Sequence, residues 1–157
     1  MKNKILILAG DPKSINTEII FKTWKKLNES IKKRFLVIGS YNLIKEQFKI
    51  LKIKVKLNKL KNIHENIDIK KINIISINLK FKDPFKVSNK HSKIFIKNSL
   101  NLAHKLSIEK SVNGLINCPI SKSILPNQKG VTEYLAKKCD IEKDSEVMLI
   151  KYRSFSV

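Results

Sequence analysis

The chain has 157 residues, of which 42% are hydrophobic, a length and apolar content that suit one folded region and exclude an intrinsically disordered chain. Its 33 basic and 13 acidic residues give a formal net charge of +20, which raises nucleic-acid binding as one function class. Only Arg34 and Arg153 are arginines, the better readers of bases and phosphates, and the lysines are spread along the chain, so nucleic acid is not the favoured partner.

The chain begins with Lys2 and Lys4 before a short apolar run, which resembles the start of a signal peptide. Gly10, Asp11 and Pro12 end that run before it reaches the length of a signal sequence, so it predicts a first buried strand. No other run approaches the roughly 18 apolar residues that span a bilayer, and we expect no membrane association. The two cysteines show no metal-binding or redox spacing, and a reduced, cytoplasmic location is expected.

Short apolar runs alternate with amphipathic segments along the chain. Strands are predicted at 4–9, 34–39, 53–57, 72–77, 114–118 and 146–150. Helices are predicted at 14–30, 41–51, 90–107 and 131–139, with a surface excursion at 58–71 and a turn at 82–86. Several strands are almost continuously apolar, as expected when both faces of a sheet are covered. The alternation predicts an α/β/α sandwich with a largely parallel sheet.

Two of the predicted helices show an apolar face. In 14–30 the predicted face contains Ile15, Ile19, Ile20, Thr23, Trp24 and Leu27. In 90–107 it contains Ile94, Phe95, Asn98, Leu102 and Leu106. Both sets follow the 3.6-residue period, so we expect these faces to pack against the sheet.

The C-terminal residues 146–157 read as a strand, a tight turn and the start of a second strand. No linker divides the chain, so residues 1–157 are expected to form a single α/β region. A sheet that stopped at Val157 would leave unpaired backbone groups at an edge, which predicts either coverage by another chain or a longer protein.

Two loops are candidate binding segments, because ligands of open α/β sheets bind outside the carboxyl ends of the strands. In the first, after strand 4–9, Gly10 permits a tight turn, Asp11 accepts hydrogen bonds, and Ser14 or Asn16 caps the next helix. Free N–H groups at a helix start bind anions. Ordinary strand–turn–helix chemistry explains the same residues, and the absence of G-x-G-x-x-G argues against an ordinary dinucleotide loop.

The second candidate segment follows strand 114–118. Pro119 ends the strand, Ser121 is predicted to cap a helix, and Lys122 lies near the start of that helix. A cation there opposes the helix dipole, so it indicates a nearby phosphate or carboxylate, unless its stem simply reaches water. Farther on, Thr132 is predicted to cap the last helix, with Glu133 in its first turn.

Nucleophilic or metal-dependent chemistry has little support in the residues themselves. A serine nucleophile at Ser121 or Ser123 has no predicted base, because His64, His91 and His104 lie in distant segments. These three histidines have no metal-ligand spacing. Cys118, at the end of a strand, is predicted to be a small buried residue.

Taken in order, four segments resemble the PdxA family, the 4-hydroxythreonine-4-phosphate dehydrogenases. The segment "GDPKSINTE" matches the family's G-[DE]-P-A-G-I-G-P-E loop, and "NCPISK" matches T-x-P-[IV]-x-K. The segment "GVTEYLA" matches G-H-T-E-[FY]-[FL], and "EVMLI" matches a strand rich in Met and Leu. The resemblance runs over essentially the whole chain, which would be the N-terminal half of such an enzyme.

The resemblance implies an isocitrate/isopropylmalate-dehydrogenase-like α/β/α fold, incomplete at the C-terminus, and an NAD- or NADP-dependent oxidation. In that reaction the hydroxyl of 4-phosphooxy-L-threonine becomes a ketone, and the β-keto acid loses CO₂ to give 3-amino-2-oxopropyl phosphate in pyridoxal phosphate biosynthesis. It also implies a homodimer and a divalent metal (Zn, Mg or Co) whose ligands lie outside these residues. Lys122, Val131 and Thr132 are the implied substrate-binding positions, with the substrate phosphate as the ligand of Lys122.

The chain departs from the family pattern at three points. Val131 stands at the position of the histidine in G-H-T-E, and valine forms no hydrogen bond. Ser14, Asn16 and Thr17 replace two glycines and a proline of the first loop. Family members are about twice as long. The alternatives are therefore a PdxA-like dehydrogenase, a non-catalytic relative or binding protein that keeps the fold, and a basic nucleic-acid-binding protein.

Overall fold

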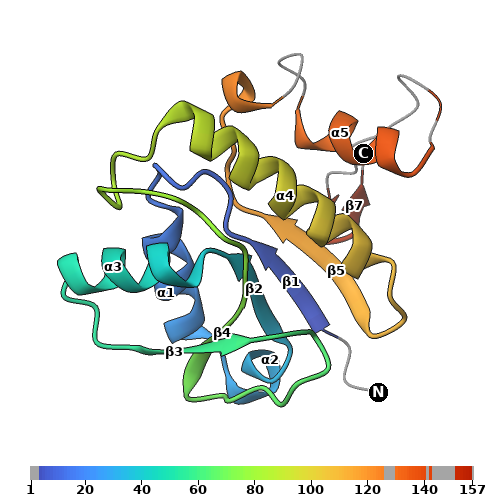
Figure 1. Ribbon diagram of the computed structural model, residues 1–157. Coiled ribbons are helices and arrows are strands. Elements are labelled where there is room, and N and C mark those ends of the chain that lie inside the picture. Colours follow the sequence, from blue (N-terminus) through green and yellow to red (C-terminus); the bar gives the residue numbers. More distant parts are fainter. Residues whose placement is uncertain (1–3, 126–129, 141, 143–150, 157) are drawn as a thin grey trace.

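A computed structural model describes residues 4–125, 130–140, 142 and 151–156 of the chain (Figure 1). In these residues the main sheet has five parallel strands in the order β3-β4-β2-β1-β5. They are β1 (Lys4–Leu8), β2 (Phe35–Gly39), β3 (Lys56–Leu60), β4 (Lys71–Ser76) and β5 (Val112–Asn117). The predicted α/β class with a parallel sheet is confirmed.

Helices cover both faces of this sheet. The long helix α4 (Asn89–Ser107) lies over one face, and α1 (Asn16–Lys26) and α3 (Tyr41–Ile50) lie over the other (Figure 1). Three short helices complete the set, namely α2 (Glu29–Lys32), the 3₁₀ helix η1 (Lys122–Ile124) and α5 (Val131–Lys138), which packs on α4. This arrangement is the predicted α/β/α sandwich.

Strand alternation divides the core into two layers. Leu6 of β1 and Leu36 of β2 belong to the cluster under α4, whereas Ile7 and Val37, one residue farther along each strand, belong to the cluster under α1 and α3. Leu6, Leu36 and Val37 are fully buried. Each such side chain contributes about 1.5–3 kcal/mol through removal from water, which explains why these strands are apolar on both faces.

The strand predicted at 53–57 lies three residues farther along, as β3, so the expected surface excursion 58–71 begins only after Leu60. The reason is that β3 is an edge strand paired with β4 alone among the described strands. Its sequence KLNKL buries only Leu60 and exposes Lys56, so it lacks the continuous apolar run that marks a central strand.

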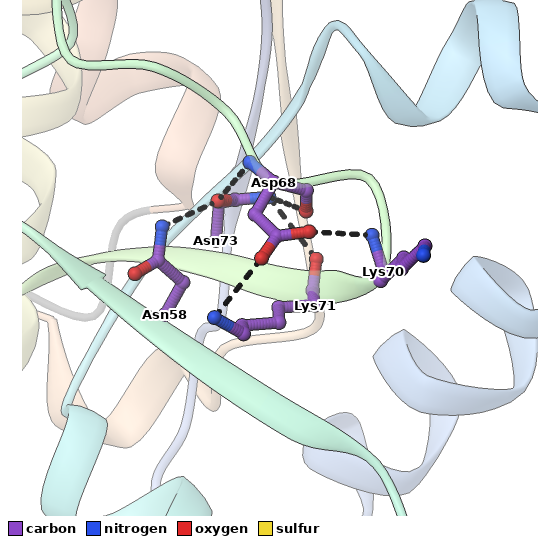
Figure 2. A network of polar contacts seen from close by, with 5 residues as sticks. All are labelled: Asn58, Asp68, Lys70, Lys71 and Asn73. Atoms are coloured by element: carbon purple, nitrogen blue, oxygen red, sulfur yellow. Dashed lines mark hydrogen bonds and ion pairs between the residues drawn. The ribbon is translucent and has the colours of Figure 1, made fainter.

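A polar network orders the loop between β3 and β4, as Figure 2 shows. Asn73 is only 1% exposed, and its side-chain amide donates to the carbonyl oxygens of Asp68 (2.9 Å) and Lys71 (3.0 Å). Its Oδ1 accepts from the Asp68 amide and from Nδ2 of Asn58. The Asp68 carboxylate in turn pairs with the Lys71 ammonium at 3.0 Å and accepts from the Lys70 amide. Every polar atom of the buried amide is thus satisfied, as burial requires.

The predicted helix 14–30 is two helices, because the chain leaves α1 at Leu27 and Asn28 caps α2 by accepting from the Ile31 amide at 3.0 Å. The predicted apolar face is also partly wrong. Ile20 and Trp24 are buried, but Ile15 is 69% exposed and Ile19 is 40% exposed. Ile19 lies beside Ile116 of β5, at the border of a groove between α1 and that strand.

The apolar face predicted for residues 90–107 is rotated in α4. Phe95 and Leu106 are buried as predicted, but Ile94 and Asn98 point to solvent. The buried stripe instead contains Ile96, Leu100 and Ala103, together with Ser92 and Ser99. A search for apolar residues alone does not identify this stripe, because two of its members are serines. The Ser99 hydroxyl donates to the Phe95 carbonyl at 2.7 Å, which permits its burial.

The C-terminal part of the described chain is a small hairpin of β6 (Lys151–Tyr152) and β7 (Phe155–Ser156), which are antiparallel. The predicted tight turn between two strands is confirmed here. The strand predicted at 146–150 lies outside the described residues. Among the helices of the described chain, none is both long and apolar enough to cross a membrane.

Candidate functional site

The candidate site lies where β1 and β5 end side by side. The chain leaves β1 for β2 by way of α1 on one face and reaches β5 from β4 by way of α4 on the other face (Figure 1). The loop after β1 and the segment after β5 therefore meet at a topological switch point. Ligands of open α/β sheets bind at such points, so the two predicted segments together form one candidate site.

Asn16 joins the two segments. It is 2% exposed, and its Nδ2 donates to the carbonyl oxygen of Ala9 at 3.0 Å and to that of Pro119 at 2.9 Å. The Asp11 amide also donates to the Pro119 oxygen, at 3.2 Å. The two loops, more than one hundred residues apart in sequence, are thus held together by hydrogen bonds that water cannot easily replace.

Gly10 makes this close approach possible. Its φ is +72°, a conformation that side chains rarely adopt, which confirms the predicted tight turn. A Cβ at this position would lie 2.6 Å from the Pro119 oxygen and 2.7 Å from Nδ2 of Asn16. Both backbone conformation and space therefore require glycine here.

The start of α1 differs from the prediction that Ser14 or Asn16 caps it. The N-cap residue is Ile15, whose side chain forms no cap hydrogen bond. Asn16 is the first helical residue, and its amide N–H donates to the Ser14 hydroxyl at 3.2 Å. That hydroxyl donates to the Asp11 carbonyl at 2.7 Å, while the Asp11 carboxylate accepts from the Lys13 amide, as predicted for Asp11. The Asn16 side chain does not cap α1, because its amide donates to the carbonyl oxygens of Ala9 and Pro119 instead.

Gln47 is a positioning residue that sequence reasoning missed. It is 1% exposed on α3, and its Nε2 donates to the carbonyl oxygens of Pro12 (3.2 Å) and Pro84 (2.8 Å). Its Oε1 accepts from the Thr17 hydroxyl. Gln47 thereby fixes the first loop against the 82–86 turn. The available signal was a polar residue within the apolar face formed by Leu43, Ile44 and Phe48.

The three predicted substrate-binding residues occupy two short helices that follow β5. Lys122 is exposed in η1, and its side-chain ammonium forms no hydrogen bond or ion pair with any described residue. Thr132 is exposed in the first turn of α5, and Val131 packs partly buried against the α4 core cluster. Both η1 and α5 contact α4. Within the described residues no hydrogen bond or ion pair joins Lys122 to Thr132, so their common role stays a prediction.

Two predicted helix caps in this region are wrong. Ser121 occupies the N-cap position of η1, but its side chain bonds to the Ser123 hydroxyl at 2.9 Å and caps no amide. Gly130, not Thr132, is the N-cap of α5, whereas Glu133 does lie in its first turn. The helix begins at Val131, as predicted, so Thr132 lies within its first turn. The Thr132 hydroxyl is consequently not used in capping.

Two of the histidines have partners outside the two site segments, and Cys118 directly follows β5. His64 pairs with Glu109 at 3.5 Å, and Nε2 of His104 lies 3.5 Å from the thiol of Cys139. Cys118 is buried as predicted, and burial raises the pKa of its thiol. Within the part of the chain that the structure describes, no three His, Cys, Asp or Glu side chains could hold a metal ion together.

Comparison with known proteins decides the family. Residues 12–157 match the family described as "Pyridoxal phosphate biosynthetic protein PdxA". The chain belongs to the PdxA family. It is 27% identical over 154 residues to a 4-hydroxythreonine-4-phosphate dehydrogenase from Sulfurihydrogenibium sp. (strain YO3AOP1), covering 94% of this chain and 46% of that protein. It is 24% identical over 152 residues to a protein of the same name from Erythrobacter litoralis (strain HTCC2594), covering 93% and 45%.

A solved structure supports the fold. The putative 4-hydroxythreonine-4-phosphate dehydrogenase from Salmonella typhimurium superposes with a TM-score of 0.81 at 20% identity, covering 99% of this chain and 50% of that one. Likeness at this identity supports the PdxA fold alone. The chain thus spans about half the length of the PdxA relatives that it matches.

The PdxA resemblance implies a nicotinamide cofactor and a divalent metal, and neither has a complete set of partners in the described residues. The first loop has a single glycine, Gly10, and lacks the G-x-G-x-x-G pattern of dinucleotide-binding loops. No three-ligand cluster exists for a cation in the described ranges. We therefore assign no reaction step through either group.

Proposed function

We propose that this chain provides the N-terminal portion of a PdxA-type dehydrogenase. The reaction is the NAD- or NADP-dependent oxidation of 4-phosphooxy-L-threonine at its hydroxyl carbon. The β-keto acid that results loses CO₂ to give 3-amino-2-oxopropyl phosphate, a step of pyridoxal phosphate biosynthesis. The family match over residues 12–157 is the observation that carries this proposal.

The residues of this chain would bind and orient the phosphorylated end of the substrate. Lys122 follows strand β5, and its exposed side chain forms no ion pair with any described acidic group. The Thr132 hydroxyl lies in the first turn of α5, where free backbone N–H groups favour an anion. A net charge of +20 further attracts a substrate that carries phosphate and carboxylate groups. Val131 would contribute apolar contact only.

The wider assembly follows from the same resemblance. We propose a cytoplasmic homodimer that holds NAD or NADP and a divalent metal with residues beyond those described. Because the chain covers under half of its curated relatives, we expect this polypeptide alone to show no NAD(P)-linked oxidation. Appearance of reduced nicotinamide with substrate and added divalent metal would contradict this expectation.

One observation favours a second candidate, a non-catalytic PdxA relative that retains substrate binding. Val131 occupies the position of a family histidine, and its side chain packs against the core instead of offering a hydrogen bond. Measuring the turnover of a full-length form and of its Val131→His variant separates the two candidates, because a non-catalytic relative that Val131 alone does not explain shows no turnover in either form. An active PdxA enzyme keeps or raises its activity, whereas a tenfold loss would show a pocket rebuilt around valine.

Calorimetric titration of the purified chain with 4-phosphooxy-L-threonine tests the binding step, with L-threonine as the unphosphorylated control ligand. We expect binding of the phosphorylated ligand only, and about tenfold weaker binding for Lys122→Gln, because one charge-assisted phosphate contact is lost. Lys93→Gln, an exposed lysine on α4, is the matched control for net charge. Equal loss in both variants would assign the effect to overall charge, and absence of binding would overturn the assignment.

A further inference from the structure

A hollow of about 870 Å³ lies beside the amino-terminal ends of β1 and β5, a volume within the range of small-molecule sites. We call it the amino-end hollow. Lys4 begins β1 and Ser111 directly precedes β5, whereas both segments of the candidate substrate site follow these strands. Strand β1 places about 13 Å between Lys4 and Leu8, so the hollow is separate from the substrate site. Its basic lining residues are Lys4, Lys33, His64 and Lys110.

The walls of the amino-end hollow are anchored segments of the fold. One wall is formed by loop residues 64–67. Ile63, just before them, is 1% exposed in the core under α4, and Asp68, just after them, donates its amide to Oδ1 of the buried Asn73 at 3.1 Å (Figure 2). Another wall is the 108–111 connection from α4 to β5, where the Lys4 amide donates to the Ser111 carbonyl at 2.7 Å. The lining side chains therefore project from backbone whose position is fixed.

Acidic and basic side chains of the hollow differ in their pairing. Both carboxylates have partners, since Glu109 lies 3.5 Å from Nε2 of His64 and Glu65 accepts from the Lys61 amide at 2.9 Å. The ammonium groups of the three lining lysines form no hydrogen bond or ion pair with any described residue. Partial burial lowers the pKa of Lys4, although the Glu109 carboxylate acts in the opposite direction. The hollow thus carries positive charge that a bound anion would compensate.

Ser111 adds an unused hydrogen-bond donor to the same hollow. Its hydroxyl oxygen is buried and has no hydrogen-bond partner among the described residues. Buried hydroxyl groups are nearly always paired, because an unsatisfied one destabilises the fold. Since Ser111 also lines the hollow, a ligand with oxygen acceptors would provide the missing partner.

We propose that the amino-end hollow binds a small organic phosphate, such as a nucleoside monophosphate. The phosphate oxygens accept from the ammonium groups of Lys4 and Lys110 and from the Ser111 hydroxyl, which are the charge-assisted and neutral donors that a phosphate can satisfy together. The apolar part of the ligand lies against Ile108, which is 71% exposed at the border of the hollow. The concave shape and the two carboxylates of the wall disfavour a nucleic-acid strand as the occupant.

Calorimetric titration of the 157-residue chain with adenosine 5′-monophosphate tests this proposal, at an ionic strength of about 0.15 M to limit non-specific attraction. Inorganic phosphate and adenosine are the comparison ligands. We expect adenosine 5′-monophosphate to bind, inorganic phosphate to bind more weakly, and adenosine not to bind measurably. The proposal does not require dehydrogenase activity, so its test is independent of the proposed function.

Lys4→Gln and Lys110→Gln should each weaken binding of the nucleotide about tenfold, and Ser111→Ala about fivefold, because each removes one donor to the phosphate. Ser111→Ala should leave the urea midpoint unchanged, since its hydroxyl has no partner among the described residues. Ile108→Ser should weaken binding of the nucleotide but not of inorganic phosphate.

Two lysine variants are matched controls for net charge. Lys93→Gln changes an exposed lysine on α4, and Lys122→Gln changes the lysine of the proposed substrate site. Both should bind adenosine 5′-monophosphate as the wild type does.

Four outcomes would overturn the proposal. The first is no binding of adenosine 5′-monophosphate to the wild-type chain. The second is an equal loss of affinity in Lys93→Gln, which would assign binding to overall charge. The third is a loss in Lys122→Gln without a loss in Lys4→Gln and Lys110→Gln, which would place the nucleotide in the substrate site. The fourth is tighter binding of a single-stranded oligonucleotide through Lys4 and Lys110, because a nucleic acid would then be the occupant.

Discussion

Asn16 and Pro119 are joined by a hydrogen bond of 2.9 Å, although 103 positions separate them in the sequence. The bond connects the start of α1 to the segment that leads from β5 to Lys122. It therefore sets the distance between the two loops from which the proposed substrate site is built. Because Asn16 is almost wholly buried, its contribution depends on satisfying polar groups that have no access to water.

Replacing Asn16 by alanine should destabilise the fold by about 1–3 kcal/mol, since it leaves the Ala9 oxygen without this donor and removes one of two donors to the Pro119 oxygen. Urea denaturation measures the change in the free energy of unfolding. Asn98→Ala, at an exposed position on α4, is the control and should change stability by under about 0.5 kcal/mol. Similar losses of stability in the two variants would show that the hydrogen bonds of the Asn16 side chain do not stabilise the fold.

Gly10→Ala should cost at least about 2 kcal/mol, because alanine resists a φ of +72° and its Cβ would meet the Pro119 oxygen at 2.6 Å. Gly114→Ala, within β5, is the matched control, since a Cβ at Gly114 meets no atom within 4 Å. We expect the Gly114 variant to stay within about 0.5 kcal/mol of wild type in the same denaturation assay. A Gly10 variant as stable as the Gly114 variant is the result that contradicts this close approach.

Asp68 should make stability depend on acidic pH. The hydrogen-bonded Lys71 ammonium, with help from the Lys70 amide, lowers the pKa of the Asp68 carboxyl below its usual value of 3.8. A carboxyl with a lowered pKa in the fold stabilises it above the unfolded pKa, and this contribution is lost as the pH falls through the folded pKa. Wild-type stability should therefore fall more steeply below about pH 4 than that of Asp68→Asn.

Denaturant midpoints measured between about pH 6 and pH 2.5 test this dependence on Asp68. The variant Lys71→Met removes the ammonium instead of the carboxylate. Its stability should likewise fall less steeply toward low pH than that of the wild type. The Asp68 carboxylate lies at the surface, so the effect is small compared with burial of the core. If stability falls equally steeply with decreasing pH in the wild type and in both variants, the Asp68–Lys71 pair has no such role.

The two cysteines should differ in their reaction with iodoacetamide. Cys139 is exposed, whereas Cys118 is 8% exposed and burial raises the pKa of its thiol. A raised pKa lowers the fraction of reactive thiolate at a given pH, so near pH 7.5 Cys139 should be alkylated at least about tenfold faster. Peptide mass spectrometry follows both sites in one sample. Equal rates would show that the segment after β5 opens readily in solution.

The match between predicted and observed elements is best where both faces of a segment are buried. The apolar runs of β1, β2 and β4 were located within about a residue, because central parallel strands tolerate little but Ile, Leu and Val. β3 was displaced by three residues, since an edge strand can alternate lysine with leucine and still pair. The helix faces of α1 and α4 were partly misassigned because buried serines and exposed isoleucines do not follow the apolar period.

By itself the sequence determined the α/β class, the position of the two loops and the PdxA resemblance, because periodicity and short motifs are local properties of the chain. Only the tertiary structure decided that Asn16 clamps Pro119, that Gln47 holds Pro12 and Pro84, and that Ile116 faces solvent. The physical reason is that a buried amide is defined by partners distant in sequence. An apolar strand, likewise, is central or an edge according to which neighbours pack against it.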